Sequence, residues 1–178
     1  MRDNRHQGVE GVVEALKAQH QQIRTAMFAV MGAEGEARQR AFLAVRQLLA
    51  LHEVVEEEVV HPVAGASLVS GPAIVADRLK EEDQVLVMIS ELEQFEVDAH
   101  EFAPRFRALQ LAVTAHAEAE EEAELGALPH RVVGREAAAE LTSRFGMAQQ
   151  VDAAGLTGSF AAMMGEVRDE LGALDRAR

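Results

Sequence analysis

Two pairs of a histidine and a glutamate four residues apart lie in long helical stretches of this chain of 178 residues. His52 and Glu56 form the first pair, and His116 and Glu120 form the second. Residues four apart lie on one face of an α-helix, about one turn from each other. Imidazole nitrogens and carboxylate oxygens bind transition metals, so each pair has the chemistry and the spacing of two metal ligands.

Both pairs lie in stretches where apolar residues recur every three or four positions, as on the buried face of a helix in a bundle. His20 occupies the same kind of position in an earlier stretch. The inward positions of these stretches are Val9, Val13, Leu16, His20, Ile23, Met27 and Val30, then Phe42, Val45, Leu49, His52, Glu56 and Val59, and last Phe102, Phe106, Leu109, Val113, His116, Glu120 and Ala123.

One further stretch, between the second and the last of these, carries a carboxylate among apolar residues. Its inward positions are Val75, Leu79, Glu82, Leu86, Ile89 and Leu92. Asp83 lies one step off this face. A buried ionised group costs several kcal/mol unless it is paired or bound to a metal, yet each of the four stretches buries at least one titratable group. One shared metal site would explain all of them.

Four helices are needed to carry these positions, and the predicted bounds are Val9–Met31, Glu36–Val60, Ala73–Glu96 and Glu101–Leu125. The four prolines lie outside these segments or near their starts, as helix geometry requires. The connections are short or rich in Gly, Pro and Ser, which favours antiparallel neighbours. We therefore predict an all-α fold, an up-down-up-down four-helix bundle. At a rise of about 1.5 Å per residue, the candidate ligands of all four helices fall at similar heights.

The chain continues beyond the bundle with two shorter helical segments, at Arg135–Phe145 and Gly158–Leu174. The second is amphipathic, with apolar residues at helical spacing: Phe160, Met163, Met164, Val167 and Leu171. We expect residues 1–128 to form the bundle and residues 129–178 to form a helical extension. The extension should pack on the bundle or on a second subunit, and in the latter case it would make a homodimer.

The charge and composition restrict the partners of the protein. Thirty acidic and 17 basic residues give a formal net charge of −13, which repels nucleic acid and anionic lipid. The absence of cysteine excludes disulfides and thiolate metal sites. No apolar run is long enough for a membrane span or a signal peptide. We therefore expect no nucleic-acid or membrane partner and a cytoplasmic location.

At this point the sequence resembles the hemerythrin-like, or HHE cation-binding, family of four-helix di-iron proteins. The residues that carry the resemblance are His20, His52 and Glu56 within LHEVVEEEVVHP, and His116 and Glu120 within TAHAEAEEEAEL. The resemblance covers roughly residues 9–128. It implies a pair of iron ions, joined by an oxo or hydroxo bridge, that meets a small ligand such as dioxygen, peroxide or nitric oxide.

The third helix departs from the family pattern, which usually places a histidine early in that helix. This chain has KEEDQVLVMI there. Helical phase favours Glu82 as the ligand, whereas alignment with the usual acidic-acidic-histidine pattern favours Asp83, so both stay open. An oxygen ligand would make the site richer in carboxylates, which should favour ferric iron and oppose reversible dioxygen transport.

Two other positions near the second helix are ambiguous. Glu53 follows His52, but its helical phase points about 100° away from the inward face. His61 precedes Pro62, where relatives commonly carry an aromatic residue, and a helix end loosened before proline could turn the ring toward the metals. The predicted metal ligands are His20, His52, Glu56, His61, Glu82, His116 and Glu120.

The remaining histidines and glutamates of these regions are expected at the surface. We interpret His6, His100 and His130 as surface or loop residues. The solvated face of the fourth helix should carry Glu118, Glu121, Glu122 and Glu124.

The expected function is that of a non-haem di-iron protein that binds or reacts with small oxidants, in sensing or in defence against oxidative stress. No second cluster of polar residues indicates an organic substrate, so enzymatic activity stays open. Two alternatives remain. The polar layer could be structural in a helical interaction or dimerisation module, or the site could hold zinc or manganese.

Overall fold

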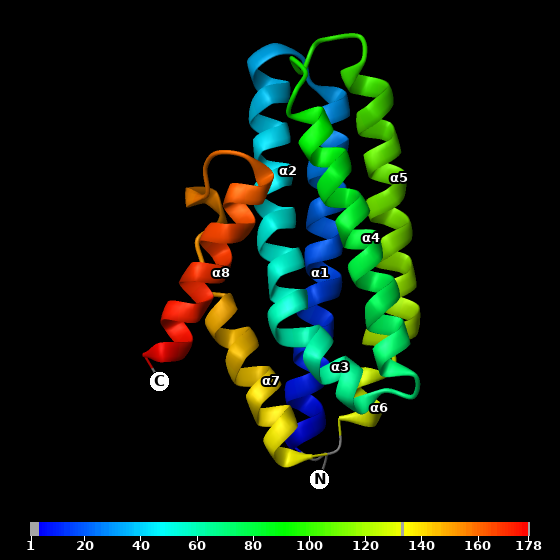
Figure 1. Ribbon diagram of the computed structural model, residues 1–178, viewed down its shortest axis with the longest axis vertical. Coiled ribbons are helices and arrows are strands. Elements are labelled where there is room, and N and C mark those ends of the chain that lie inside the picture. Colours follow the sequence, from blue (N-terminus) through cyan, green and yellow to red (C-terminus); the bar gives the residue numbers. More distant parts are fainter. Residues whose placement is uncertain (1–3, 133, 178) are drawn as a thin grey trace.

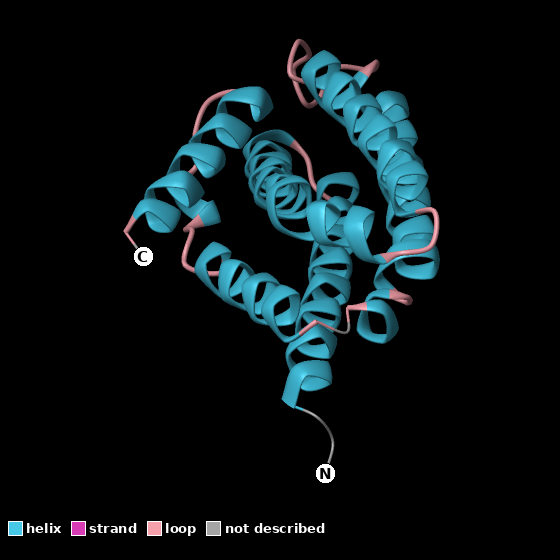
Figure 2. Cartoon of the chain, turned by 60° about the horizontal axis from the view of Figure 1, so that its bottom comes forward, coloured by secondary structure: helices cyan, strands magenta, loops and turns pink. Residues whose placement is uncertain are grey.

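The computed structural model describes residues 4–132 and 134–177 of the chain. All regular structure in these residues is helical, which confirms the all-α prediction (Figure 2). No helix in this part of the chain is long and apolar enough to cross a membrane.

Four long helices form the bundle, and successive ones run in opposite directions (Figure 1). They are α1 (Asn4–Gly32), α2 (Gly35–Val55), α4 (Gly71–Leu92) and α5 (Phe102–Glu120). Every predicted inward residue of the first helix is buried, as are those of the second. At one end of the bundle, Phe42 packs edge to face against Phe102 and Phe106, with ring centroids 5.2 and 5.9 Å away. This apolar end anchors the helices that carry the polar layer further along.

The buried face of α4 differs from the predicted one in its first half. Its buried residues are Gly71, Arg78, Glu82, Val85, Ile89 and Leu92. The prediction for Leu79 was wrong, because it is 40% exposed and Arg78 is buried in its place. Val75 and Leu86 are half-buried. Arginine can take such a position because its long stem covers apolar surface while its guanidinium reaches a carboxylate.

Two of the helices contain a π-helical turn near the polar layer. α2 continues through η1 (Glu56–Val60) into α3 (His61–Ser67), and α5 continues through η2 (Glu121–Leu125) toward α6 (Leu128–Arg131). In η1 the His61 N–H donates to the Glu56 carbonyl, five residues earlier. A π-helical turn holds one more residue than an α-helical turn, so it rotates the residues beyond it relative to α-helical phase.

The second helix does not end at Val60, as the sequence suggested, but continues past Pro62 to Ser67. Proline lacks an N–H and disturbs the α-helical ladder, and here a π-helical turn lies directly before it. α3 then ends close to the start of α4, where a Cβ on Gly71 would lie 2.5 Å from the Ala64 carbonyl oxygen. Only glycine fits there, so the turn between α3 and α4 is tight.

The C-terminal segment lies along one side of the bundle (Figures 1 and 2). α7 (Arg135–Ala148) packs against α1, and α8 (Phe160–Arg176) packs against α2 and α4. The predicted apolar face of α8 is buried in these contacts: Phe160, Met163, Met164, Val167 and Leu171. The division of the chain into domains at residue 128 stays a prediction.

Candidate metal centre

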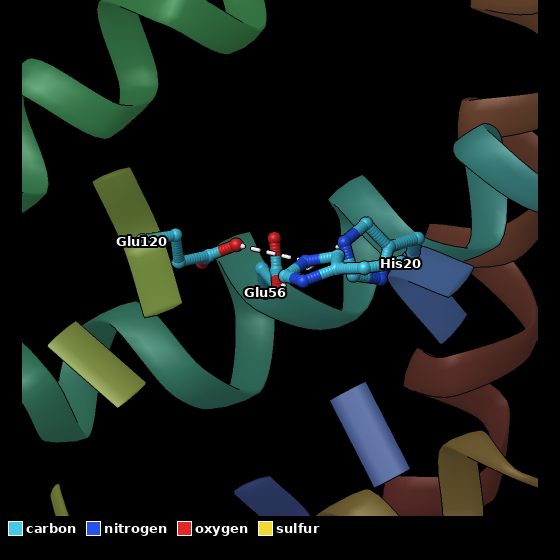
Figure 3. A group of neighbouring side chains, drawn as sticks. His20, Glu56 and Glu120 are labelled. Carbon is cyan, nitrogen blue, oxygen red and sulfur yellow. Dashed lines mark ion pairs between the residues drawn. The ribbon is translucent and has the colours of Figure 1, made fainter. Parts of the chain in front are cut away.

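The bundle brings all seven predicted ligands into one buried layer, where each side chain is at most 5% exposed. They come from six consecutive helical elements: His20 from α1, His52 from α2, Glu56 from η1, His61 from α3, Glu82 from α4, and His116 and Glu120 from α5. In Figure 3 the Glu120 carboxylate points across the layer toward Glu56 and the imidazole of His20.

One cluster of four side chains lies between α1, α2, η1 and α5. His20, His52, Glu56 and Glu120 each offer a ligand atom, and these atoms all lie within 4.8 Å of one another. His20 Nε2 is 3.2 Å from Glu120 Oε2, and His52 Nε2 is 3.4 Å from Glu56 Oε1. Such spacing suits a single transition-metal ion with two nitrogen and two oxygen ligands.

A second cluster shares a carboxylate with the first. Glu53, Glu56, Glu82 and His116 also place one ligand atom each within 4.8 Å of one another. Glu56 belongs to both clusters, and Glu120 Oε2 lies 3.9 Å from His116 Nε2, so it also reaches both. Two carboxylates that reach both clusters have the arrangement of bridging ligands between two metal ions.

Three histidines are oriented from the outside through their Nδ1 atoms. His20 Nδ1 lies 2.8 Å from Glu121 Oε1, His52 Nδ1 lies 2.9 Å from Gln19 Oε1, and His116 Nδ1 lies 3.0 Å from Glu81 Oε2. When each ring donates its Nδ1–H to such an acceptor, the Nε2 lone pair faces the layer. Histidine ligands of metals are generally fixed by an outer acceptor in this way.

The outer partners follow a rule that connects neighbouring helices. Each is the sequence neighbour of a predicted ligand on a different helix: Gln19 precedes His20, Glu81 precedes Glu82, and Glu121 follows Glu120. The side chain next to an inward residue lies on the flank of the helix, and in a bundle the flank faces the next helix. The sequence pattern did not indicate Gln19 or Glu81, although this adjacency was a signal that could have found them.

Two arginines orient the outer carboxylates in turn. Arg78 Nη2 donates to Glu81 Oε1 at 3.0 Å, while the other oxygen of Glu81 faces His116. Arg24 Nη2 lies 3.5 Å from Glu121 Oε1, the atom that faces His20. In both cases an arginine contacts a glutamate, and that glutamate contacts a histidine. The arginine therefore helps to fix the glutamate that orients the histidine ring.

Many polar atoms of the layer are buried without a hydrogen-bond partner among the described residues. They include the Nε2 atoms of His20, His52 and His116, both carboxylate oxygens of Glu56 and Glu120, and one oxygen each of Glu53, Glu82 and Glu124. Buried polar atoms left unpaired cost about 1–3 kcal/mol each, so this many at one place indicates a missing ligand. The unpaired nitrogens and oxygens are a donor set that fits a pair of transition-metal ions.

The electrostatics of the layer favour the same interpretation. Burial and the neighbouring His20 and His116 lower the pKa of His52 to about 3, so the ring is neutral and able to bind a metal. Burial and the nearby carboxylates raise the pKa values of Glu53 and Glu56 well above their usual range. Cations bound between these groups would relieve the repulsion among the carboxylates.

His61 is held differently from the other three histidines. Its Nε2 lies 2.7 Å from Glu82 Oε1, and its Nδ1 lies 2.9 Å from Glu124 Oε1, so both ring nitrogens already have partners. Burial alone would lower the pKa of His61, but the hydrogen bonds to Glu124 and Glu82 outweigh it and raise the pKa to about 10. His61 is therefore a buried imidazolium between two carboxylates. His61, Glu120 and Glu124 also form a third group with ligand atoms within 4.8 Å of one another.

The prediction that Glu124 lies on the solvated face of its helix was wrong, because its side chain is fully buried. Ala123, which was expected to face inward, is exposed. The π-helical turn η2 explains both differences, since it shifts the inward position by one residue. Glu118 and Glu122 are exposed as expected, whereas Glu121 is half-buried against His20.

The structure separates the alternatives that the sequence left open. Glu82 is buried and faces the layer, whereas Asp83 is exposed. Glu53 is buried and belongs to the second cluster, because its flank of the helix faces the neighbouring helix and not solvent. His100 and His130 are exposed, and the side chain of His6 lies outside the described residues.

A small cavity of about 10 Å³ adjoins the layer. Its apolar walls are Ile23, Leu49, Val113 and Ala117, and its polar walls are His20, His52, Glu53, His116 and Arg24. A volume of this size holds about one water-sized molecule. The space beside the candidate ligands therefore fits a very small molecule.

The fold and the layer together define a four-helix bundle protein with a buried metal-binding centre of histidine and glutamate. The hemerythrin HHE cation-binding domain matches residues 11–128, about two-thirds of the chain. The chain belongs to this family, which confirms the resemblance seen in the sequence, and cation binding, typically of iron, is the property of this domain. No curated protein and no solved structure matches the chain.

Proposed function

We propose that this chain is a non-haem di-iron protein whose buried metal pair binds or reacts with a small oxidant such as dioxygen, peroxide or nitric oxide. The observation that supports this proposal most strongly is the set of three Nε2 atoms, each fixed by an outer partner and facing carboxylates shared between two clusters. When bound, the iron pair would supply the redox chemistry.

The two clusters suggest how the ligands divide between the ions. His20 and His52 would hold one ion, and His116 and Glu82 would hold the other, with Glu53 beside it. The carboxylates that reach both clusters, those of Glu56 and Glu120, would bridge the ions. We propose that His61 mainly holds Glu82 toward the layer, because direct ligation by its Nε2 would break that hydrogen bond.

Charge balance supports a pair of divalent ions. The buried carboxylates of the layer are Glu53, Glu56, Glu82, Glu120 and Glu124. If all five are ionised, their negative charge is balanced by the positive charge of two divalent cations together with the His61 imidazolium. A buried layer without net charge avoids the large desolvation cost of an uncompensated ion.

The cavity supports a diatomic molecule or a peroxide as the ligand. It has room for about one water-sized molecule, and Ile23, Leu49, Val113 and Ala117 give it apolar walls beside the histidines. An organic substrate would not fit beside the layer without movement of the helices. Sensing of small oxidants or defence against them, in the cytoplasm, is the physiological role that we propose.

A second candidate function differs in the identity of the bound metal. The same nitrogen and oxygen donors also suit zinc or manganese. A purely structural polar layer in a dimerisation module has less support, because the apolar face of α8 that was a candidate for dimer contacts is buried within the same chain.

Metal analysis and an electronic spectrum of the purified protein test the proposal. We expect close to two iron ions per chain and the near-ultraviolet charge-transfer absorption of a ferric pair, which changes when peroxide or nitric oxide is added. The variants His52→Leu and His116→Leu should lose metal, whereas His100→Leu, at an exposed site, should keep it. Stoichiometric zinc without charge-transfer bands, or folded protein that binds no metal, would overturn the di-iron proposal.

A further inference from the structure

The C-terminal helices contact the outer side of η1, the π-helical turn that carries Glu56. Arg144 of α7 donates from Nη1 to the Glu58 carbonyl at 2.8 Å. Pro62 has no N–H with which to reach this carbonyl, which lies four residues before it. The arginine therefore supplies a donor to this carbonyl where the α-helical one is missing.

A second arginine contacts side chains of the same turn. Arg168 of α8 forms an ion pair with Glu57, and its Nε lies 3.8 Å from Glu58 Oε1. Arg144 Nη2 also donates to Asp175 at 3.1 Å, which joins α7 to α8. The two helices thus contact one backbone group and two side chains of η1 from the outside.

The inner side of the same turn faces the metal layer. Glu56 is fully buried there, and its carbonyl accepts the N–H of His61. A π-helical turn is less stable than an α-helical one and persists where other contacts support it. If η1 relaxed to α-helical phase, the residues from His61 onward would rotate away from their present positions.

We propose that α7 and α8 act as an external clamp that keeps η1 in its π-helical form and thereby positions Glu56 and His61 at the metal layer. Arg144 and Arg168 are the positioning residues of this clamp. The effect on metal affinity rests on the proposed metal-binding function, whereas the effect on the backbone of η1 does not.

The test compares the double variant Arg144→Met/Arg168→Met with the control Arg46→Met. Arg46 holds the start of α8 in two ways: it donates to the Gly158 carbonyl at 3.1 Å, and it pairs at 2.5 Å with Glu93, which accepts the N–H of Phe160. The control therefore loosens α8 without removing a contact to η1. The variant Arg144→Lys/Arg168→Lys keeps a cationic donor at each position and should restore most of the wild-type behaviour.

Two readouts separate the clamp from general stability. Hydrogen exchange of the His61 amide in the metal-free protein reports on the π-helical turn, and titration with Co²⁺, followed by its visible absorption, reports on the metal layer. In the methionine double variant we expect at least tenfold faster exchange at His61 and a 10- to 100-fold loss of Co²⁺ affinity, as for outer-shell changes in general. The Arg46→Met control should change each by less than threefold.

Unchanged exchange at His61 in the double variant would overturn the clamp, and so would an equal effect in Arg46→Met. If the double variant does not fold, the two single variants take its place, and each should show a smaller change in the same direction. Failure of wild-type protein to bind Co²⁺ or iron would contradict the proposed function instead, and hydrogen exchange would still decide whether the clamp exists.

Discussion

The buried pair formed by His61 and Glu124 allows a quantitative test of the interpretation of the layer. The His61 Nδ1 atom lies 2.9 Å from Glu124 Oε1, and both side chains are almost fully shielded from solvent. Removing one partner of a buried ion pair costs about 3–5 kcal/mol, because the other charge stays buried without compensation. We therefore expect Glu124→Leu to lower the free energy of unfolding of the metal-free protein by about 3–5 kcal/mol.

The double variant His61→Leu/Glu124→Leu removes both charges of this pair. It should cost at least about 2 kcal/mol less than the sum of the two single variants, because replacing both partners of a buried pair by apolar residues is close to neutral. Some loss should remain, since Glu82 also loses its hydrogen bond from His61.

Urea unfolding of the metal-free variants, followed by far-ultraviolet circular dichroism, measures these free energies. In a thermal scan, the Glu124→Leu variant should melt roughly 6–20 °C lower than the wild type. The exposed Glu122→Leu variant is the control and should stay within about 0.5 kcal/mol of the wild type. Additive costs in the double variant, within about 0.5 kcal/mol, would refute the paired arrangement of the two side chains.

Three further predictions concern the layer and the bundle. Gln19→Leu removes the outer acceptor of His52 and should weaken metal binding by about 10–100-fold in a competition titration; an unchanged affinity would show that the contact does not orient the ring. In the metal-free protein, the lowered pKa of His52 favours the unfolded state as the pH drops below 6.5, but the raised pKa values of Glu53 and Glu56 act in the opposite direction there. Above pH 6.5 the raised pKa values of Glu53, Glu56 and His61 act together, because the folded state holds protons that the unfolded state has lost, so stability should fall as the pH rises from 6.5 toward 10. A Tm that did not fall between pH 7 and 9 would contradict the raised pKa values. Phe42→Ala, at the apolar end of the bundle, should cost about 3–5 kcal/mol yet leave the number of bound metal ions unchanged in metal analysis.

Helical periodicity was sufficient to predict most of the ligand layer. His20, His52 and Glu56 occupy inward positions that depend only on the local 3.6-residue period, and the structure places them where that period predicts. The same holds for His116 and Glu120. The all-α fold and the antiparallel order of the four helices also followed from periodicity and from the placement of turn residues.

Predictions that depended on an unbroken α-helical phase were wrong. Glu124 is buried and Ala123 exposed because η2 contains one extra residue in its turn. The second helix continues past Pro62 directly after η1, where Arg144 donates to the Glu58 carbonyl that Pro62 has no N–H to reach. In η1 the Glu58 carbonyl is contacted by Arg144 from a distant part of the chain, and such contacts are not visible in the local pattern.

The sequence by itself determined which residue types form the layer and which helices carry them, because these depend on the chemistry of His and Glu and on local periodicity. Only the tertiary structure decided between Glu82 and Asp83. It also places Glu53 in the second cluster and Gln19 beside His52. These outcomes depend on which flank of each helix faces a neighbouring helix. That choice is made when the helices pack, since rotation of a helix by one residue changes its inward face.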